Sequence, residues 1–225
     1  MANPFVSVAV LFLVSFILLI SKHIILAIIP LGIAIYKTLS ILGIIRKCVF
    51  FRGSFVEGVV FTKDYIGSYS NNSAAFEEAA RLIRNFKLKD YIIIAIYFDE
   101  PGNDNKNMKY SVGVYRKNVG FPEKPPEEFE RYCNENGYNM TELPNATSLY
   151  SSWEYHSFYT LMVGIQKFYA TLKQNLNDDN FKRAYKIRDA SQIKTFIELY
   201  ESKTLVSFHV PLLFADKFNV FKKDK

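Results

Sequence analysis

The sequence predicts an α+β protein in which an N-terminal transmembrane helix precedes one domain of two pseudo-symmetric βαββ units. Two observations support this fold class. A long apolar run opens the chain of 225 residues, and strand-like and helix-like patterns then follow one another in the same order twice. We therefore expect a membrane anchor over residues 1–36, a juxtamembrane connector over 37–54, the folded domain over 55–212 and a short basic tail over 213–225.

The apolar run covers residues 5–36 and holds only two ionisable side chains, Lys22 and His23. A helix rises about 1.5 Å per residue, so about 20 residues cross a hydrocarbon core of about 30 Å. Since no Lys or Arg precedes the run, a retained anchor is favoured over a cleaved signal peptide. The alternative is a span over residues 5–21 followed by a hydrophobic helix over 24–45 in the same leaflet. Both arrangements give a single net crossing.

Basic residues near the ends of the apolar run predict its orientation. None precedes it, whereas four follow it, namely Lys37, Arg46, Lys47 and Arg52. We therefore expect a luminal N-terminus and a cytosolic domain, and a chain with only two cysteines agrees with that reducing compartment. Three glycosylation sequons, at Asn71, Asn139 and Asn145, favour the lumen instead if they are used.

The last residues of the chain resemble a localisation signal. Lys222 and Lys223 stand at the fourth and third positions from the carboxyl end, as in the dilysine signal that returns membrane proteins to the endoplasmic reticulum. Such a signal is read by a receptor in the cytosol, where the charge rule places this end. The predicted location is therefore the endoplasmic reticulum membrane, with a single pass.

The folded domain repeats the order strand, helix, strand, strand. In the first half the strand covers residues 57–66, the helix 73–86, and the two further strands 91–98 and 109–116. A short helix over 126–136 separates the halves. In the second half the strand covers residues 146–156, the helix 158–175, and the two further strands 195–200 and 204–211.

The repeat extends to side chains, since residues 94–97 (Ile-Ala-Ile-Tyr) correspond to residues 197–200 (Ile-Glu-Leu-Tyr). Alternation along the strand puts Glu198 and Tyr200 on one face and the Ile and Leu side chains on the other. If the two helices cover the Ile/Leu face, the opposite face carries a carboxylate and a phenol in a groove suited to a ligand. The candidate groove residues are Tyr97, Trp153, Tyr155, Glu198 and Tyr200.

Two βαββ units, with Glu-x-Tyr on the penultimate strand and Pro211-Leu212 ending the last one, resemble the GyrI-like effector-binding domain. Joined to an N-terminal span, the chain resembles the testis-expressed protein 264 family, receptors for autophagy of the endoplasmic reticulum. The matching stretches cover residues 59–69, 94–101, 109–113, 196–200 and 209–212. The resemblance implies a cytosol-facing adaptor or receptor whose partners are autophagy or protein-quality-control proteins.

The chain departs from that family at its end. The family's receptor activity depends on a long acidic tail with an autophagosome-binding motif, whereas only 13 residues, mostly basic or apolar, follow Leu212 here. The alternative is a GyrI-like small-molecule binding protein or hydrolase, with Glu198 as general base and Tyr200 as hydrogen-bond donor. The adaptor interpretation is favoured over an enzyme.

Other functional classes lack a matching pattern. His23, His156 and His209 are far apart in sequence and neither cysteine has a neighbour at metal-ligand spacing, so we expect no metal site. We expect no cofactor, because no glycine-rich phosphate loop is present. The net charge of +6 comes from basic residues scattered among acidic ones, which predicts membrane lipid, contacted through residues 5–36, rather than nucleic acid as a partner.

Overall fold

The computed structural model describes residues 4–21, 23–68, 72–99, 107–118, 124–187, 190, 193–213 and 215–221. The chain divides into two compact units. The helical unit consists of Met1–Cys48 and Tyr155–Lys167, and the sheet unit consists of Val49–Glu154 and Phe168–Lys225.

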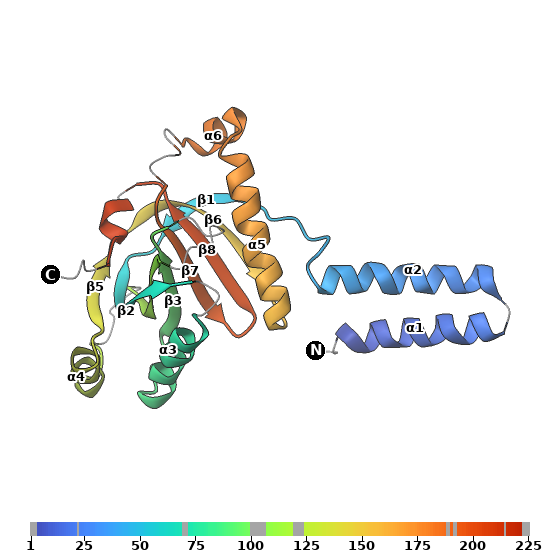
Figure 1. Ribbon diagram of the computed structural model, residues 1–225, viewed down its shortest axis with the longest axis horizontal. Coiled ribbons are helices and arrows are strands. Elements are labelled where there is room, and N and C mark those ends of the chain that lie inside the picture. The colour runs from blue at the N-terminus through green and yellow to red at the C-terminus, as the bar shows by residue number, and fades with distance from the viewer. Residues whose placement is uncertain are drawn as a thin grey trace. The chain divides into compact units, whose positions relative to one another are not determined.

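The helical unit begins with two helices, α1 (Pro4–Ile20) and α2 (Ile24–Ile41), which form an antiparallel hairpin (Figure 1). The expected continuous helix over residues 5–36 is not observed, because α1 ends at Ile20 and α2 begins at Ile24, where polar residues interrupt the apolar run of the sequence. The two-helix alternative had bounds close to those found. Within the described part of the chain, no helix combines the length and the apolar character that a membrane crossing requires.

The described residues of the sheet unit form an eight-stranded antiparallel sheet in the order β1-β6-β8-β7-β3-β4-β2-β5. Their bounds are β1 (Phe51–Phe55), β2 (Gly58–Gly67), β3 (Tyr91–Tyr97), β4 (Met108–Lys117), β5 (Asn139–Leu143), β6 (Ala146–Glu154), β7 (Phe196–Ser202) and β8 (Leu205–Pro211). The further helices are α3 (Ser73–Asn85), α4 (Glu127–Glu135), α5 (Phe158–Asn175), α6 (Asp179–Tyr185) and the 3₁₀ helix η3 (Ala215–Phe218). Helix α5 begins in the helical unit and ends in the sheet unit.

Local sequence explains these helices. In α3, three buried residues at helical spacing, Ala75, Ala79 and Leu82, form the stripe that packs against the sheet. In α4, Phe129 and Cys133 are buried one turn apart, below a first turn rich in glutamate, which suits the positive end of a helix dipole.

The predicted α+β fold and the repeat of βαββ units are confirmed. The units are β2-α3-β3-β4 and β6-α5-β7-β8, the second with α6 inserted, and their strands appear in the sheet in mirrored order around a central β3–β7 pair. This arrangement is compatible with a GyrI-like domain. Strands β1 and β5 were not predicted; four of the five residues of β1 lie within the segment expected as the connector, and the two strands form the edges of the sheet.

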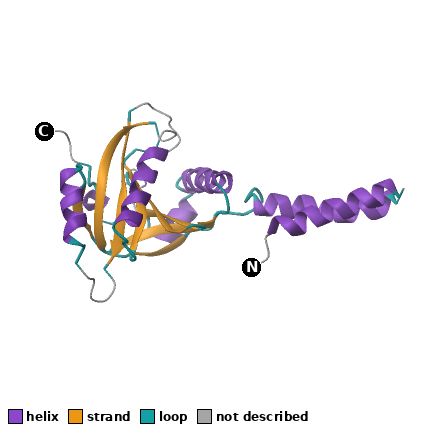
Figure 2. Ribbon diagram, turned by 90° about the horizontal axis from the view of Figure 1, so that it is seen from below, coloured by secondary structure: helices purple, strands orange, loops and turns teal. Residues whose placement is uncertain are grey.

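The sheet curls around its own core (Figure 2). One buried cluster contains Phe55 and Leu143 from the two edge strands together with Ile94 and Ile197 from the central pair. Residues from both edges and the middle meet there only because the sheet is strongly curved. Phe218 of η3 completes the cluster, so the expected tail contributes to the core.

Helices α3 and α5 lie on the opposite face of the sheet. The ring of Phe76 in α3 is 5.0 Å from that of Tyr200, and Tyr169 of α5 donates a hydrogen bond to Glu198. The helices therefore cover the Glu198/Tyr200 face, and the premise that they cover the Ile/Leu face is wrong. Ile197 and Leu199 face the concave core of the curled sheet instead, which is already filled by side chains from other strands and from η3.

Gly113 on β4 is a point where the sheet tolerates no side chain. A Cβ atom there would overlap the backbone carbonyl of Phe61 on β2. We expect Gly113→Ala to lower the free energy of unfolding by about 1–3 kcal/mol, the usual cost of overpacking. Urea denaturation followed through Trp153, the only tryptophan of the chain, measures this change. Gly67→Ala at the end of β2 is the control, because no atom lies within 4 Å of its added Cβ; equal stability of both variants would contradict the prediction.

Candidate functional site

The candidate site is centred on Glu198, a carboxylate that is only 1% exposed on the central strand β7. Tyr97 and Tyr200 donate hydrogen bonds to its Oε2 over 3.2 and 2.9 Å, and Tyr169 donates to its Oε1 over 3.2 Å. Both carboxylate oxygens are therefore held by phenols. Among the residues that the structure describes, these partners are neutral donors rather than cations.

This environment shifts the protonation equilibria of the cluster. Burial raises the pKa of Glu198 to about 7, and the hydrogen bonds from Tyr200, Tyr97 and Tyr169 offset only part of that effect. The pKa of Tyr200 is raised well above its ordinary value, first by burial and then by the neighbouring carboxylate. Glu198 can therefore be protonated or ionised near neutral pH while Tyr200 keeps its proton.

Strand register explains how the cluster forms. Alternation along β7 puts Phe196, Glu198 and Tyr200 on one face. On the neighbouring strand, Tyr97 pairs with Phe196 and Ala95 pairs with Glu198. Because directly paired residues place their Cβ atoms only about 5 Å apart on the same face, the small Ala95 leaves space for the carboxylate and its phenol partners.

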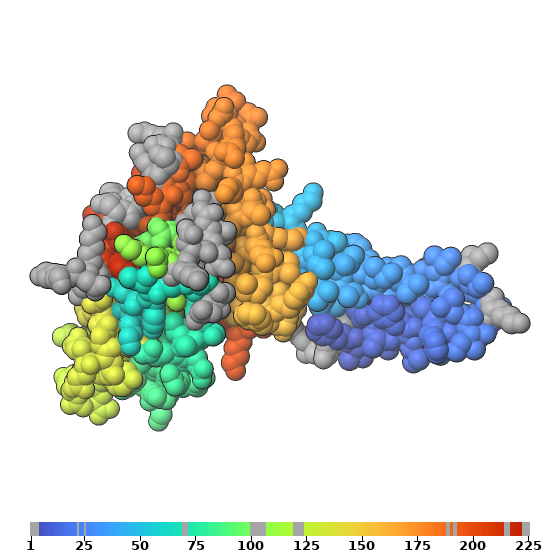
Figure 3. All heavy atoms as spheres, viewed as in Figure 1, coloured from blue at the N-terminus to red at the C-terminus, as the bar shows by residue number. Residues whose placement is uncertain are grey.

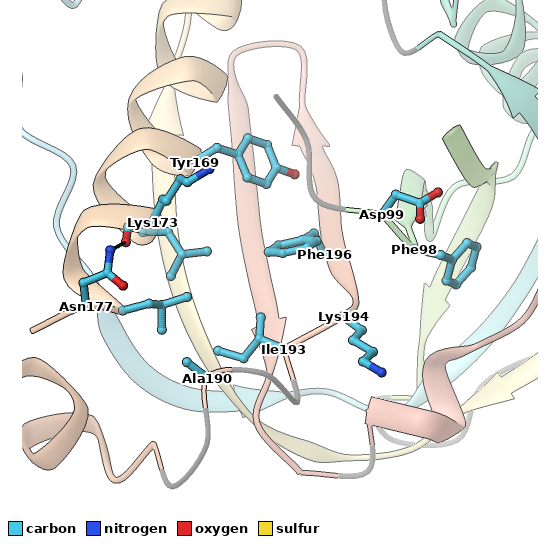
Figure 4. A pocket seen from close by; sticks show the side chains of 11 residues that line it. Phe98, Asp99, Tyr169, Lys173, Asn177, Ala190, Ile193, Lys194 and Phe196 are labelled. Carbon is cyan, nitrogen blue, oxygen red and sulfur yellow. Dashed lines mark hydrogen bonds between the residues drawn. The ribbon is translucent and has the colours of Figure 1, made fainter. Parts of the chain in front are cut away.

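A cavity of about 520 Å³ adjoins the cluster, and Figure 4 shows its lining. Tyr169 belongs to both, since its side chain lines the cavity and its hydroxyl bonds to Glu198. Its ring lies 5.6 Å from that of Phe196, which also lines the cavity. The other lining residues are Phe98, Asp99, Leu172, Lys173, Leu176, Asn177, Ala190, Ile193 and Lys194. The cavity is thus mostly apolar and aromatic, with a few charged groups.

A row of aromatic side chains crosses the sheet toward the same site. Tyr65 on β2 pairs with Tyr110 on β4, which pairs with Tyr97 on β3, and Tyr97 pairs with Phe196 on β7. The rings of Tyr65 and Tyr110 are stacked with centroids 5.5 Å apart, and those of Tyr97 and Tyr110 are 6.2 Å apart. The row fixes the orientation of Tyr97, one of the donors to Glu198.

The structure brings together three of the five predicted groove residues, Tyr97, Glu198 and Tyr200. Trp153 is buried on the same sheet face but two strands from Tyr200, because it pairs with Val206, which pairs with Tyr200. Tyr155 belongs to the helical unit. The predicted retrieval residues 222 and 223 lie outside the described residues.

Sequence reasoning missed Tyr169, although a signal for it exists. Tyr169, Leu172 and Lys173 line the cavity from one face of α5, at a spacing of three and four residues, and Leu176, directly after the helix, lines it as well. The apolar residues of this helix surround its axis, so periodicity alone did not show which face meets the sheet.

Metal binding has no candidate in the described part of the chain, where no three His, Cys, Asp or Glu side chains gather as metal ligands would. His209 lies on the other side of the sheet, where its ring is 5.5 Å from that of Phe55. Burial lowers the pKa of His209 to about 4, so it is neutral at physiological pH.

Comparisons with known proteins give structural neighbours only. No protein-family model and no curated protein sequence matches the chain. The structure of SAV2435 bound to tetraphenylphosphonium aligns with a TM-score of 0.46 and 11% identity, covering 72% of this chain and 93% of that one. A hydrolase from Listeria innocua aligns with a TM-score of 0.45 and 12% identity, covering 73% of this chain and 92% of that one. The EcmrR–DNA complex aligns with a TM-score of 0.45 and 13% identity, covering 88% of this chain and 76% of that one.

Similarity at this level defines neither a family nor a function for this chain. The fold and the site define a class, namely an α+β protein with a curled eight-stranded antiparallel sheet of two βαββ units and a buried carboxylate between their helices. The absence of nucleic acid among its partners stays a prediction.

The raised pKa of Glu198 predicts a pH-dependent stability. Between its ordinary value of 4.5 and about 7, the unfolded chain has lost the proton that the folded protein keeps, so the free energy of unfolding falls as pH rises through this window. The decrease should be on the order of 3 kcal/mol between pH 5 and pH 8. Urea denaturation at several pH values measures it.

Glu198→Gln should abolish this part of the pH dependence, because glutamine carries no titrating proton. Glu142→Gln, at an exposed position on β5, is the matched control and should keep it. The same pH profile in wild type and Glu198→Gln would show that Glu198 is not responsible.

Proposed function

We propose that the sheet unit binds a small organic molecule with an aromatic or apolar body and a cationic or hydrogen-bond-donating group. The observation that carries this proposal is the buried Glu198, held by three phenols beside a cavity of about 520 Å³. Cavities of this size and character are typical of small-molecule sites.

The chemistry of the wall supports this class of ligand. Tyr169 and Phe196 offer ring faces, which attract cations and flat apolar groups. A cation near Glu198 would favour its ionised form and so recover part of the cost of burying that charge. Lys173 and Lys194 also line the cavity and suit a polar substituent elsewhere on the ligand.

This function is the alternative that the sequence left open, and it is now preferred over an adaptor. The receptor role implied by the resemblance to the testis-expressed protein 264 family has no support from the comparisons. Attachment to a membrane, and location in the endoplasmic reticulum with a cytosolic sheet unit, remain proposals that rest on the apolar N-terminal run and the basic residues after it.

A second candidate function is hydrolysis of a small electrophilic molecule. It is favoured by the pKa of Glu198 near 7, which suits a general base, and by phenol groups that can donate to a developing oxyanion. Binding and hydrolysis require the same residues and differ only in the fate of the ligand.

Tetraphenylphosphonium is a suitable aromatic cation with which to test the binding function. We expect its affinity for the protein to rise about tenfold between pH 6 and pH 8, because the ionised fraction of Glu198 rises as pH passes a pKa of about 7. Glu198→Gln should weaken binding at pH 8 at least tenfold and remove the pH dependence. Isothermal titration calorimetry measures both, with Glu142→Gln as control; an unchanged affinity in Glu198→Gln would exclude a role for this carboxylate.

Hydrolysis can be tested with a series of aryl esters. If Glu198 is a general base, the rate should rise with pH through about 7 and fall about 100-fold or more in Glu198→Gln. Glu142→Gln should retain the wild-type rate. Turnover that survives Glu198→Gln would place any catalysis elsewhere, whereas binding without turnover would leave the binding function alone.

A further inference from the structure

The α1–α2 hairpin exposes its large apolar side chains, which helices that pack in water bury. Seventeen large apolar side chains on the two described helices are exposed, among them Leu13, Ile17 and Ile29 at 58%, 53% and 63%. In a helical pair that is surrounded by water, such side chains would face the partner helix and polar ones would face outward. Here large apolar side chains dominate the exposed surface of α1 and α2.

The seam between the helices is made of smaller residues. Val8 and Ser15 of α1, and Ala27 and Ala34 of α2, are the buried positions, and the last two lie seven residues apart on one face. Figure 3 shows the two helices in close contact along their length. Small residues at a close helix–helix seam, with large apolar ones outside, are the arrangement expected where lipid surrounds the pair.

Three hydroxyl groups of the hairpin donate hydrogen bonds to backbone carbonyls four residues earlier in the chain. Ser15 donates to the carbonyl of Leu11 over 2.8 Å, Ser21 to that of Ile17 over 2.9 Å, and Thr38 to that of Ala34 over 2.8 Å. These bonds leave the three hydroxyls independent of water, which is what a hydrocarbon environment requires of buried polar groups.

Charged and aromatic residues mark the end at which the chain leaves the hairpin. Tyr36 is 64% exposed near the end of α2, and Lys37 follows it. Arg46 and Lys47 are exposed a few residues later, and no acidic residue occurs before Glu57. An aromatic ring followed by basic side chains suits the headgroup level of a membrane with anionic lipids.

We propose that the α1–α2 hairpin inserts into a lipid bilayer as a re-entrant element, with its N-terminus and the end of α2 on the same side. Because the helices are antiparallel, their outer ends lie together at one end of the pair (Figure 1). The sequence carries a lysine and a histidine between the two helices, and the exposed apolar surface of α1 and α2 offsets the cost of bringing these ionisable residues to lipid. This topology differs from the single crossing expected from the sequence, and it does not depend on the proposed ligand site.

The test uses the full chain with different tags at its two ends, synthesised in the presence of sealed microsomes. After a carbonate wash, we expect the protein in the membrane pellet, with both tags digested by added protease or both protected. Detergent should expose any protected tag and so verify the protease. One tag digested and the other protected would establish a single crossing and overturn the proposal, as would recovery of the wild-type protein in the supernatant.

A triple variant tests the outer surface of the hairpin. Leu13→Asp, Ile17→Asp and Ile29→Asp together should release the protein from phosphatidylcholine–phosphatidylserine vesicles, since each charge lowers partition about a hundredfold. The matched control carries Ile66→Asp, Met140→Asp and Leu213→Asp, at exposed apolar positions of the sheet unit, and should stay bound. The fluorescence of Trp153, which is buried in the sheet unit, verifies that this unit is folded in both variants. Vesicle binding that survives the hairpin substitutions would contradict the proposal.

Discussion

The pairing of β3 with β7 is the interaction on which the rest of the sheet unit depends. It joins the two βαββ units, and because it lies at the centre of the order β1-β6-β8-β7-β3-β4-β2-β5, every other strand is positioned outward from it. Its register places Ala95 opposite Glu198 and Tyr97 opposite Phe196. A shift by one residue would turn the carboxylate into the apolar core and bring an isoleucine to the site. The fold and the site are therefore determined by the same hydrogen-bonded ladder.

Two glutamates of the sheet unit show how partners decide the charge state. Burial acts to raise the pKa of Glu78, but hydrogen bonds from Tyr138 and Tyr65 and the ammonium group of Lys63 outweigh it, so that its pKa is lowered. Glu198 has three phenol partners, lacks the cation among its described partners, and is far more buried, so its pKa is raised. The hydrogen bonds from the three phenols lower the pKa of Glu198 by less than burial raises it. That imbalance leaves a carboxyl group that can respond to a ligand's charge.

The sequence predicted the order of strands and helices and the side-chain alternation within a strand. It did not predict the packing between segments that are distant in the chain. The repeated βαββ order and the common face of Glu198 and Tyr200 follow from alternation and spacing within each strand. The face covered by α3 and α5 did not follow, because the opposite face is also apolar and is closed by Phe218, which belongs to the end of the chain. Tyr169 reaches the site from 29 residues earlier in the chain, and only the packing of α5 reveals that contact. The division into α1 and α2 was predicted only as an alternative, since the run continues to be apolar beyond residue 23.

The internal symmetry of the sheet unit is broken at the position that carries the carboxylate. The two halves superpose Ala95 on Glu198 by their repeat, and the register sets these two residues directly across from each other. If the halves arose by duplication, one copy now carries the carboxylate of Glu198, and the other carries the small side chain of Ala95, which leaves space for that carboxylate. A symmetric pair of glutamates would bring two negative charges together and neither could be accommodated easily. The asymmetry thus leaves a single buried carboxylate, Glu198, at the pair of facing positions that the two halves share.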